Sequence, residues 1–273
     1  MSRVATSAQH GKRRRIPGAK LVDEAGDMVG FAGRALVSAA GASRYFAEIL
    51  RQASFLILGT TLVIVGMVTV IGGECGLFGV YLLRSIGAES FLGTNPPICG
   101  LREMWPYMFG YLFAAKVGCG LVAEIGSMRI NEEIDGLESV GIDPMRYIVA
   151  TRLLAVWLTV PAIYAIAILF GALGSALAVL VQFGAVSRGQ FESLLLATWT
   201  TPDTLYSFIK TIVIATAIAL VGMYYGYRAR GGPVGVGNAT ARSMIVNLVL
   251  IHVIGGALST IFWSGNYGIS FGG

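Results

Sequence analysis

The feature that most constrains this chain is a series of long apolar segments without charge. The longest covers residues 153–187 and contains no acidic or basic side chain over 35 positions. A helix needs about 20 mostly apolar residues to cross the ~30 Å hydrocarbon core of a bilayer. Only 13% of the chain is charged, about half of the ~25% that is usual in soluble domains. The sequence therefore predicts an all-α integral membrane protein.

Five segments are apolar enough to span a membrane. Only the second and the fourth contain a charged residue, Lys116 and Lys210 respectively. The predicted spans lie at 53–73 with an extension towards 83, at about 105–123, within 153–187, at about 205–227 and within 243–263. An odd number of spans places the two termini on opposite sides of the membrane.

The basic residues predict the orientation of these spans. Nine of the 20 Lys and Arg residues lie within residues 1–51, and six more lie in the connections between spans two and three and between spans four and five. Only Arg84, Arg102, Arg188 and Lys210 lie on the opposite side. Because short cytoplasmic loops are enriched in Lys and Arg, we expect a plasma-membrane protein with its N-terminus inside and its C-terminus outside. Topology thus accounts for the net charge of +5 without a nucleic-acid partner.

The segment before the first span combines helical apolar spacing with acidic residues. Its apolar positions are Leu21, Val22, Ala25, Met28, Val29, Ala32 and Leu36. This pattern predicts an amphipathic helix within residues 19–50 that lies in the membrane interface, and a soluble helix that folds against a partner is the alternative. Residues 1–18, which include a basic run at 12–15, are expected to be a disordered tail that contacts anionic lipid. Residues 51–273 form the predicted membrane domain.

The sequence contains no recognisable catalytic or metal-binding motif. Cys75, Cys99 and Cys119 are an odd set without metal-site spacing, so we predict neither a disulfide framework nor a zinc site. His10 and His252 lie in the basic tail and in an apolar span, which predicts no histidine metal centre. The motifs G-x-x-x-x-G-K-S/T and H-E-x-x-H do not occur, and the one match to G-x-S-x-G is at 268–272, in the last residues of the sequence. We therefore expect a non-catalytic chain that binds no cofactor itself.

The connection between spans two and three is acidic, although it lies on the basic side of the chain. From Arg129 to Glu138 there are four acidic residues and one basic residue. A helix over 127–141, with Ser127 as its N-cap, would place apolar residues on one face and carboxylates on the other. Such a face suits a basic groove on a partner, and a solvated loop helix is the alternative. The predicted docking residues are Arg129, Ile130, Glu132, Glu133, Ile134, Asp135, Leu137 and Glu138.

Two runs resemble a known family. The run at 123–144, Ala-Glu-Ile-Gly-Ser-Met-Arg-Ile-Asn-Glu-Glu-Ile-Asp-Gly-Leu-Glu-Ser-Val-Gly-Ile-Asp-Pro, closely resembles the signature of the MlaE/YrbE permeases. The run at 231–243, Gly-Gly-Pro-Val-Gly-Val-Gly-Asn-Ala-Thr-Ala-Arg-Ser, resembles the actinobacterial YrbE B-type subunits of Mce lipid transporters. The resemblance spans most of residues 20–265. Where the family commonly has alanine, this chain has Gly136, which loosens the helix by up to ~1 kcal/mol.

The resemblance implies an ABC transporter permease with an interfacial helix and five spans. Such a permease pairs with a related A-type permease and binds a cytoplasmic ATPase dimer through a coupling helix, here residues 127–141. ATP and Mg²⁺ would be bound by that ATPase, and a hexamer of Mce proteins would carry lipid onward. The resemblance also implies import of lipid, with a fatty acid, mycolic acid or sterol as the expected cargo, and a phospholipid would fit an apolar cavity as well. The alternatives are an ion-coupled secondary carrier and a structural subunit without its own lipid site.

By analogy with the family, the first, second and fifth spans border a lipid cavity. From the first two spans, we expect its lining to include Met67, Val70, Leu77, Phe78, Tyr81, Tyr107, Met108, Phe113 and Lys116. Core packing is the alternative role for the aromatic and Met residues. Lys116 would face a lipid headgroup or pair with Glu124 or with a charge on the sister subunit. The pairs Gly72/Gly76 and Gly222/Gly226 have the spacing of close helix contacts, and chance is the alternative.

Overall fold

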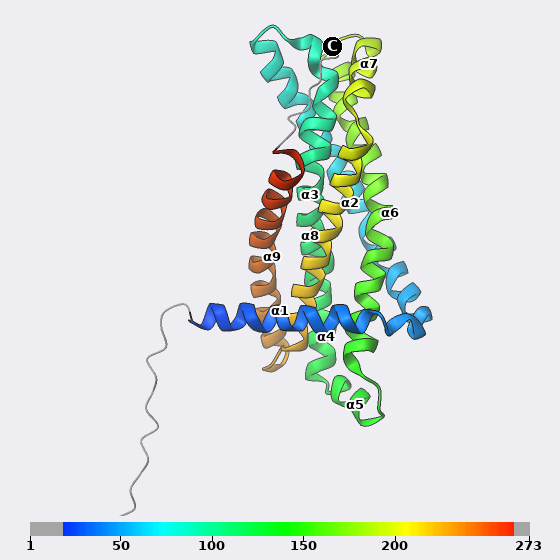
Figure 1. Ribbon diagram of the computed structural model, residues 1–273, viewed down its shortest axis with the longest axis vertical. Helices are drawn as coiled ribbons and strands as arrows, with labels where there is room; N and C mark the ends of the chain where they lie inside the picture. Colours follow the sequence, from blue (N-terminus) through cyan, green and yellow to red (C-terminus); the bar gives the residue numbers. More distant parts are fainter. Residues whose placement is uncertain (1–18, 265–273) are drawn as a thin grey trace, which may run out of the picture.

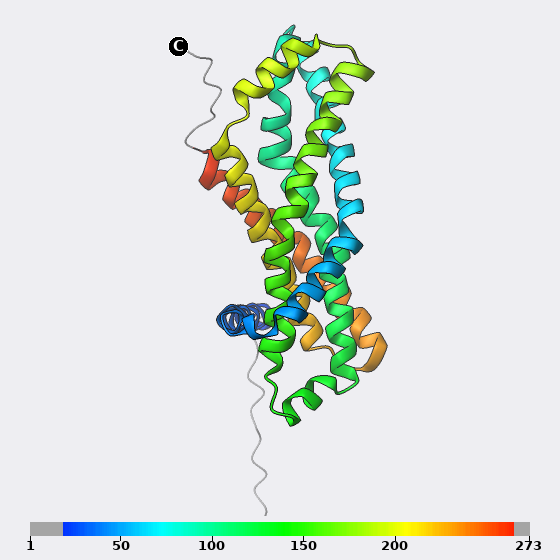
Figure 2. The ribbon, with the colours of Figure 1, turned by 90° about the vertical axis from the view of Figure 1, so that its right-hand side faces the viewer.

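The computed structural model describes residues 19–264, which form helices and short connections with no β-strand among them. Five helical segments are long and apolar enough to cross a membrane, and they form an elongated bundle (Figures 1 and 2). The five segments are Ala42–Ser85, Glu89–Ile130, Met145–Gln182, Thr201–Tyr227 and Gly232–Trp263. The predicted all-α membrane fold is confirmed. The predicted tail at 1–18 lies outside the described residues.

Several spans are built from consecutive helical elements. The first contains a short 3-10 helix, η1 (Ala42–Tyr45), and α2 (Phe46–Ser85). The second contains η2 (Glu89–Thr94), η3 (Pro96–Met104), α3 (Trp105–Phe113), η4 (Ala114–Gly118) and α4 (Cys119–Ile130). The third contains η5 (Met145–Ala150), α6 (Thr151–Ala176) and η6 (Leu177–Gln182). The fourth and fifth are α8 (Thr201–Tyr227) and α9 (Gly232–Trp263).

The N-terminal helix α1 (Ala19–Ala39) lies across the bundle near one end, whereas the spans run along it (Figure 1). Phe31 is buried on its inner side, with its ring 5.7 Å from that of Tyr224. Val22 and Val29 on the opposite side are 72% and 73% exposed. The helix ends at Ala39 and does not reach residue 50 as predicted, because the chain turns at 40–45 over buried Ala42.

Close packing between α2 and α6 depends on glycine. A Cβ atom at Gly72 would collide with the backbone of Gly171, and one at Gly174 would collide with the backbone of Thr69. A Cβ at Gly222 in α8 would likewise lie 2.8 Å from the carbonyl oxygen of Gly118. Both predicted glycine pairs therefore mark contacts between helices of this one chain. Such backbone proximity maximises dispersion contacts where lipid supplies no hydrophobic driving force.

Cys75 of α2 and Cys99 of η3 form a disulfide, with their Cα atoms 6.0 Å apart. The prediction that the cysteines offer no disulfide was therefore wrong. The two residues are 24 positions apart in sequence, and the turn between the first two spans brings them to the same level of the bundle. Cys119 is the free cysteine among the described residues.

Candidate functional site

The acidic connection between spans two and three forms a short helix of its own, α5 (Glu133–Ser139). The preceding helix α4 ends at Ile130, and Glu132 adopts a left-handed backbone with φ of 60°. The predicted single helix over 127–141 is therefore interrupted, and Ser127 lies inside α4 rather than at an N-cap. A left-handed residue reverses the course of the chain, at a cost of about 1–2 kcal/mol for a side chain with a Cβ. This turn directs α5 across the end of the bundle, beyond the level of α1 (Figure 1).

Apolar and ionic contacts hold α5 against its own chain. Ile134 is completely buried, and Leu137 packs against the same core. Arg129 donates a hydrogen bond of 2.6 Å to the Asp135 carboxylate. Burial of one isoleucine side chain contributes about 1.5–3 kcal/mol, so these contacts fix the helix to the end of α4.

The remaining predicted docking residues are on the surface. Glu132, Glu133 and Glu138 are exposed, and their carboxylates make no hydrogen bond or ion pair with any residue between 19 and 264. Ile130 is half-buried at the end of α4. The predicted set thus divides into residues that anchor α5 and three carboxylates that an external partner can reach.

A groove of about 480 Å³ lies beside α5. It is lined by Glu48, Arg51, Glu124, Ser127, Met128, Glu133, Tyr147 and Arg152. Arg152 is 5% exposed and binds the Glu124 carboxylate at 2.5 Å and the Ile148 carbonyl oxygen at 3.0 Å. The predicted pairing of Lys116 with Glu124 is therefore wrong. Sequence reasoning missed this groove, because α2, α4, α5 and the start of the third span each supply part of it.

Four predicted lipid-pathway residues share an exposed face of α2. Met67, Val70, Phe78 and Tyr81 are 40–62% exposed, and their spacing places them on one side of the helix. Glu74 is exposed on the same side, whereas Leu77 is half-buried. Among the described residues, Phe183 packs against Tyr81 at one end of this face, and the rest of the face is exposed, so lipid or another subunit can contact it.

Two further predicted residues line a pocket of about 250 Å³ between α3 and α9. Tyr107 and Met108 lie there beside Met104, Tyr111 and His252. The Tyr111 hydroxyl is 2.7 Å from Nε2 of His252, which links the second span to the fifth. The His252 side of this pocket was not predicted, because periodicity alone does not reveal which spans are neighbours.

The last two predicted lining residues have different environments. Phe113 is 1% exposed and stacks on Phe109 with ring centroids 5.6 Å apart. It is therefore a core residue of this chain, which favours core packing, the alternative role given for the aromatic residues, over a position in the lipid pathway. Lys116 is exposed, and its ammonium group makes no hydrogen bond or ion pair within the described part of the chain.

A buried charge cluster connects the second, fourth and fifth spans at the end remote from α5. Lys210 has no exposed side-chain surface, and its Nζ lies 2.8 Å from Glu103 and 2.6 Å from the Ser259 hydroxyl. Nearby, Arg102 binds Asp203 at 3.0 Å, and the Trp263 indole donates a 2.6 Å hydrogen bond to the same carboxylate. In the sequence, this cluster is visible only as a lysine inside an apolar span. The partners of Lys210 are distant in sequence, with Ser259 49 positions away and Glu103 107 positions away.

Comparisons with known proteins agree with this architecture. Residues 49–261 match the family model described as Permease MlaE. The chain is 30% identical over 213 residues to the intermembrane phospholipid transport system permease protein MlaE of Haemophilus influenzae, covering 77% of this chain and 81% of that protein. It is 28% identical over 221 residues to a probable ABC transporter permease protein of Rickettsia prowazekii, and this match covers 80% of this chain and 84% of that protein. The chain is also 29% identical over 182 residues to Protein TRIGALACTOSYLDIACYLGLYCEROL 1, chloroplastic, of Arabidopsis thaliana. This match covers 64% of this chain and 51% of that protein.

Proposed function

The chain belongs to the MlaE permease family, and we propose on that basis that it is the membrane-spanning subunit of an ABC transporter that moves phospholipid or a related lipid. The Haemophilus relative is named for intermembrane phospholipid transport, which supports lipid as the cargo. The sequence has no G-x-x-x-x-G-K-S/T motif, so a partner ATPase would bind ATP and Mg²⁺. The chain itself would supply the lipid path and the attachment point, without a catalytic role.

The acidic surface of α5 is the observation that carries this proposal. Glu132, Glu133 and Glu138 project from a helix that buried Ile134 and the Arg129–Asp135 pair fix to α4. Complementary charge would set the orientation of a basic groove on the ATPase. Because α4 continues into the second span, movement of α5 with the ATPase would pass directly to the residues that border the lipid.

The disulfide supports an orientation with α5 in the cytoplasm. Disulfides persist in oxidising compartments outside the cytosol, and Cys75–Cys99 connects the ends of spans one and two that lie away from α5. The Lys and Arg distribution favours the same orientation. We therefore propose a plasma-membrane location, with residue 19 and α5 on the cytoplasmic side.

We further propose the Mce-type arrangement for the rest of the complex. A related A-type permease would cover the exposed α2 face that contains Met67, Val70, Phe78 and Tyr81. Lipid would contact that face and the Tyr107–Met108 pocket, and Lys116 would meet either a lipid headgroup or a charge on the sister permease. An Mce hexamer outside the membrane would exchange lipid with the pair, in the direction of import, with a fatty acid, mycolic acid or sterol as candidate cargo.

Co-purification from the native membrane in mild detergent tests the coupling role of α5. We expect the wild-type chain to retain an ATPase and to show ATP hydrolysis, whereas Glu133→Lys/Glu138→Lys retains neither. Both side chains are exposed and without a hydrogen-bonded partner in the described chain, so the variant should fold normally.

A matched charge reversal at the opposite end of the bundle provides the control. Glu89 and Glu192 form surface ion pairs with Arg84 and Arg188, and Glu89→Lys/Glu192→Lys should retain the ATPase. Equal ATPase recovery with all three chains would exclude α5 as the coupling element. A wild-type chain that retains no ATPase would contradict the transporter proposal and favour an ion-coupled carrier.

A further inference from the structure

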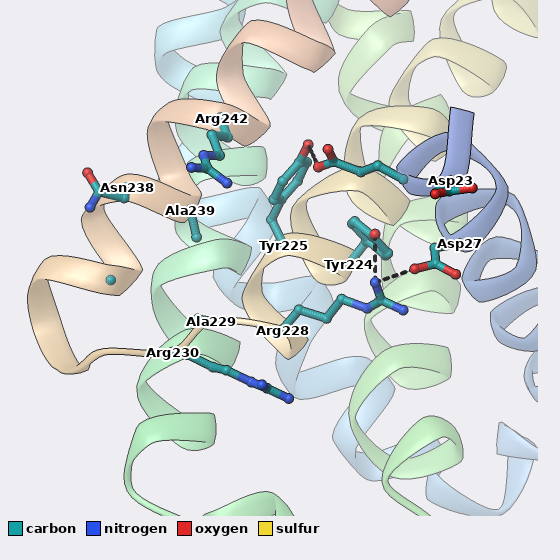
Figure 3. Close-up of a pocket in the computed structure, with 12 residues that line it drawn as sticks. Asp23, Asp27, Tyr224, Tyr225, Arg228, Ala229, Arg230, Asn238, Ala239 and Arg242 are labelled. Atoms are coloured by element: carbon teal, nitrogen blue, oxygen red, sulfur yellow. Dashed lines mark hydrogen bonds and ion pairs between the residues drawn. The ribbon is translucent and has the colours of Figure 1, made fainter. Parts of the chain in front are cut away.

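A groove separate from the α5 surface lies between α1, the end of α8 and the beginning of α9. Its volume is about 560 Å³. Asp23, Glu24 and Asp27 line it from α1, and Arg228 and Arg230 line it from the connection after α8. The α9 wall contains Asn238, Ala239 and Arg242, and Figure 3 shows the arginines of this side across from the α1 carboxylates, with Tyr224 and Tyr225 between them.

Three of the charged groups in this groove are already paired. The Tyr225 hydroxyl donates a 2.7 Å hydrogen bond to Glu24. Arg228 binds Asp27 at 2.8 Å and the Tyr224 hydroxyl at 2.9 Å (Figure 3). The hydrogen bond with Asp27 raises the pKa of the Arg228 guanidinium. These bonds hold α1 against the end of α8 and give the groove a defined floor.

Three other charged groups have no such partner. Asp23, Arg230 and Arg242 line the groove, but they make no hydrogen bond or ion pair with any residue in the part of the chain that the structure describes. Arg242 lies on α9, Arg230 lies on the connection before α9, and the Asp23 carboxylate lies on the α1 side (Figure 3). The free charges of the groove are therefore two positive groups and one negative group, supplied by three different segments.

The surroundings of the groove place it at the surface of the bilayer. α1 exposes Val22 and Val29 next to its acidic residues, as expected of a helix at headgroup depth. Above Arg242, the same face of α9 exposes Ile245, Val249 and Val253, which follow it at helical spacing. A charged groove thus continues into an apolar strip that runs towards the bilayer interior.

We propose that this groove binds the headgroup of a zwitterionic, ammonium-bearing phospholipid, with its phosphate at Arg230 and Arg242, its ammonium at Asp23 and an acyl chain along Ile245, Val249 and Val253. Arginine donors suit phosphate oxygens because the guanidinium offers several N–H groups in one plane. The bound lipid would connect α1 to α9 across the groove. Binding at this groove requires neither ATP nor the partner ATPase.

Lipid binding to the purified full chain tests the proposal. The chain is delipidated in detergent, and its titration with short-chain phosphatidylethanolamine is followed by native mass spectrometry and by thermal stabilisation. We expect Arg230→Gln/Arg242→Gln to weaken binding by on the order of tenfold or more, as for loss of charge-assisted hydrogen bonds. Arg34→Gln, which removes an exposed arginine elsewhere on α1, should bind like wild type.

Further variants separate the headgroup site from a general effect of charge or folding. Arg230→Lys/Arg242→Lys retains both positive charges but not the planar guanidinium, so it should bind more tightly than the glutamine variant and less tightly than wild type. Asp23→Asn should weaken binding of phosphatidylethanolamine but not of phosphatidylglycerol, which lacks the ammonium group. If Asp23→Asn and the glutamine variant both bind phosphatidylethanolamine as wild type does, the groove is not its site.

The soluble headgroup distinguishes a lipid from a free anion. Inorganic phosphate and O-phosphoethanolamine lack acyl chains, so we expect them to bind far more weakly than the lipid at this groove. If either binds as tightly as phosphatidylethanolamine, the groove is a soluble-anion site and the lipid proposal is wrong. Because the assay contains no ATPase, its failure would leave the transporter proposal untouched.

Discussion

At the scale of single residues, two lysines inside predicted spans have opposite environments. Lys210 is buried and hydrogen-bonded to Glu103, Ser259 and the carbonyl oxygen of Arg102, whereas Lys116 is exposed without a hydrogen bond in the described chain. The sequence identified Lys116 as unusual, because a charge in an apolar span is costly, and it placed Lys210 in the fourth span without a special role. It did not identify the partners, since Glu103 and Ser259 meet Lys210 only after three spans have packed together.

Replacement of each lysine by methionine tests this difference. Lys210→Met leaves the Glu103 carboxylate without its partner, and because Glu103 is 42% exposed we expect a loss of about 2–3 kcal/mol, below the usual cost of breaking a fully buried pair. Lys116→Met should change stability by no more than about 0.5 kcal/mol. Unfolding of both variants in the same detergent provides the measurement. Equal stability of the two variants would contradict the buried cluster.

At the scale of helices, the sequence predicted how many elements there are better than where they end. Apolar runs fix the number of spans, because a bilayer sets a minimum length. The end of α1 at Ala39 and the interruption at Glu132 depend on local backbone turns that periodicity does not detect. The disposition of α5 residues illustrates the same limit, since Ile134, one of the predicted docking residues, is buried against its own chain, and Ser127 belongs to the preceding helix.

Glycine substitutions in α2 test how closely it packs on α6. Gly72→Ala places a Cβ against the backbone of Gly171, which cannot move aside without separating the helices, so we expect a loss of about 1–3 kcal/mol. Gly66→Ala in the same helix meets no atom within 4 Å, and it should be neutral or stabilising by up to ~1 kcal/mol. The melting temperatures of the two variants would be compared in one detergent. If Gly72→Ala were as stable as wild type, α2 and α6 would have to lie farther apart in the protein than the structure places them.

At the scale of the whole molecule, family resemblance and hydropathy predicted the architecture, but contacts between distant segments required the structure. The disulfide is the clearest case, since three unevenly spaced cysteines gave no pairing signal. The Tyr111–His252 contact and the groove between α1 and α9 likewise join elements more than 100 positions apart. Phe113 shows the converse, because an aromatic residue in the correct span proved to be part of the core.

Thiol counting tests the disulfide. We expect the denatured chain, purified without reductant, to react with one maleimide at Cys119, and the reduced chain to react with three. Cys75→Ser/Cys99→Ser should lower stability by about 3 kcal/mol, as expected for closing a loop of this length, while Cys119→Ser serves as the matched control. Three labels before reduction would show that the bond does not form.

The orientation of the molecule can be tested with two serines at opposite ends of the bundle. Ser139 of α5 and Ser193 of α7 (Arg188–Thr198) are both exposed, and each donates a hydrogen bond to the carbonyl oxygen three residues earlier in its helix. In a Cys119→Ser background, Ser193→Cys should react with a membrane-impermeant maleimide on intact cells, whereas Ser139→Cys should react only after lysis. The proposed topology requires this difference, because α5 must lie in the compartment that contains ATP. Labelling of Ser139→Cys on intact cells would reverse the orientation, and the free carboxylates of α5 could not then receive a cytoplasmic ATPase.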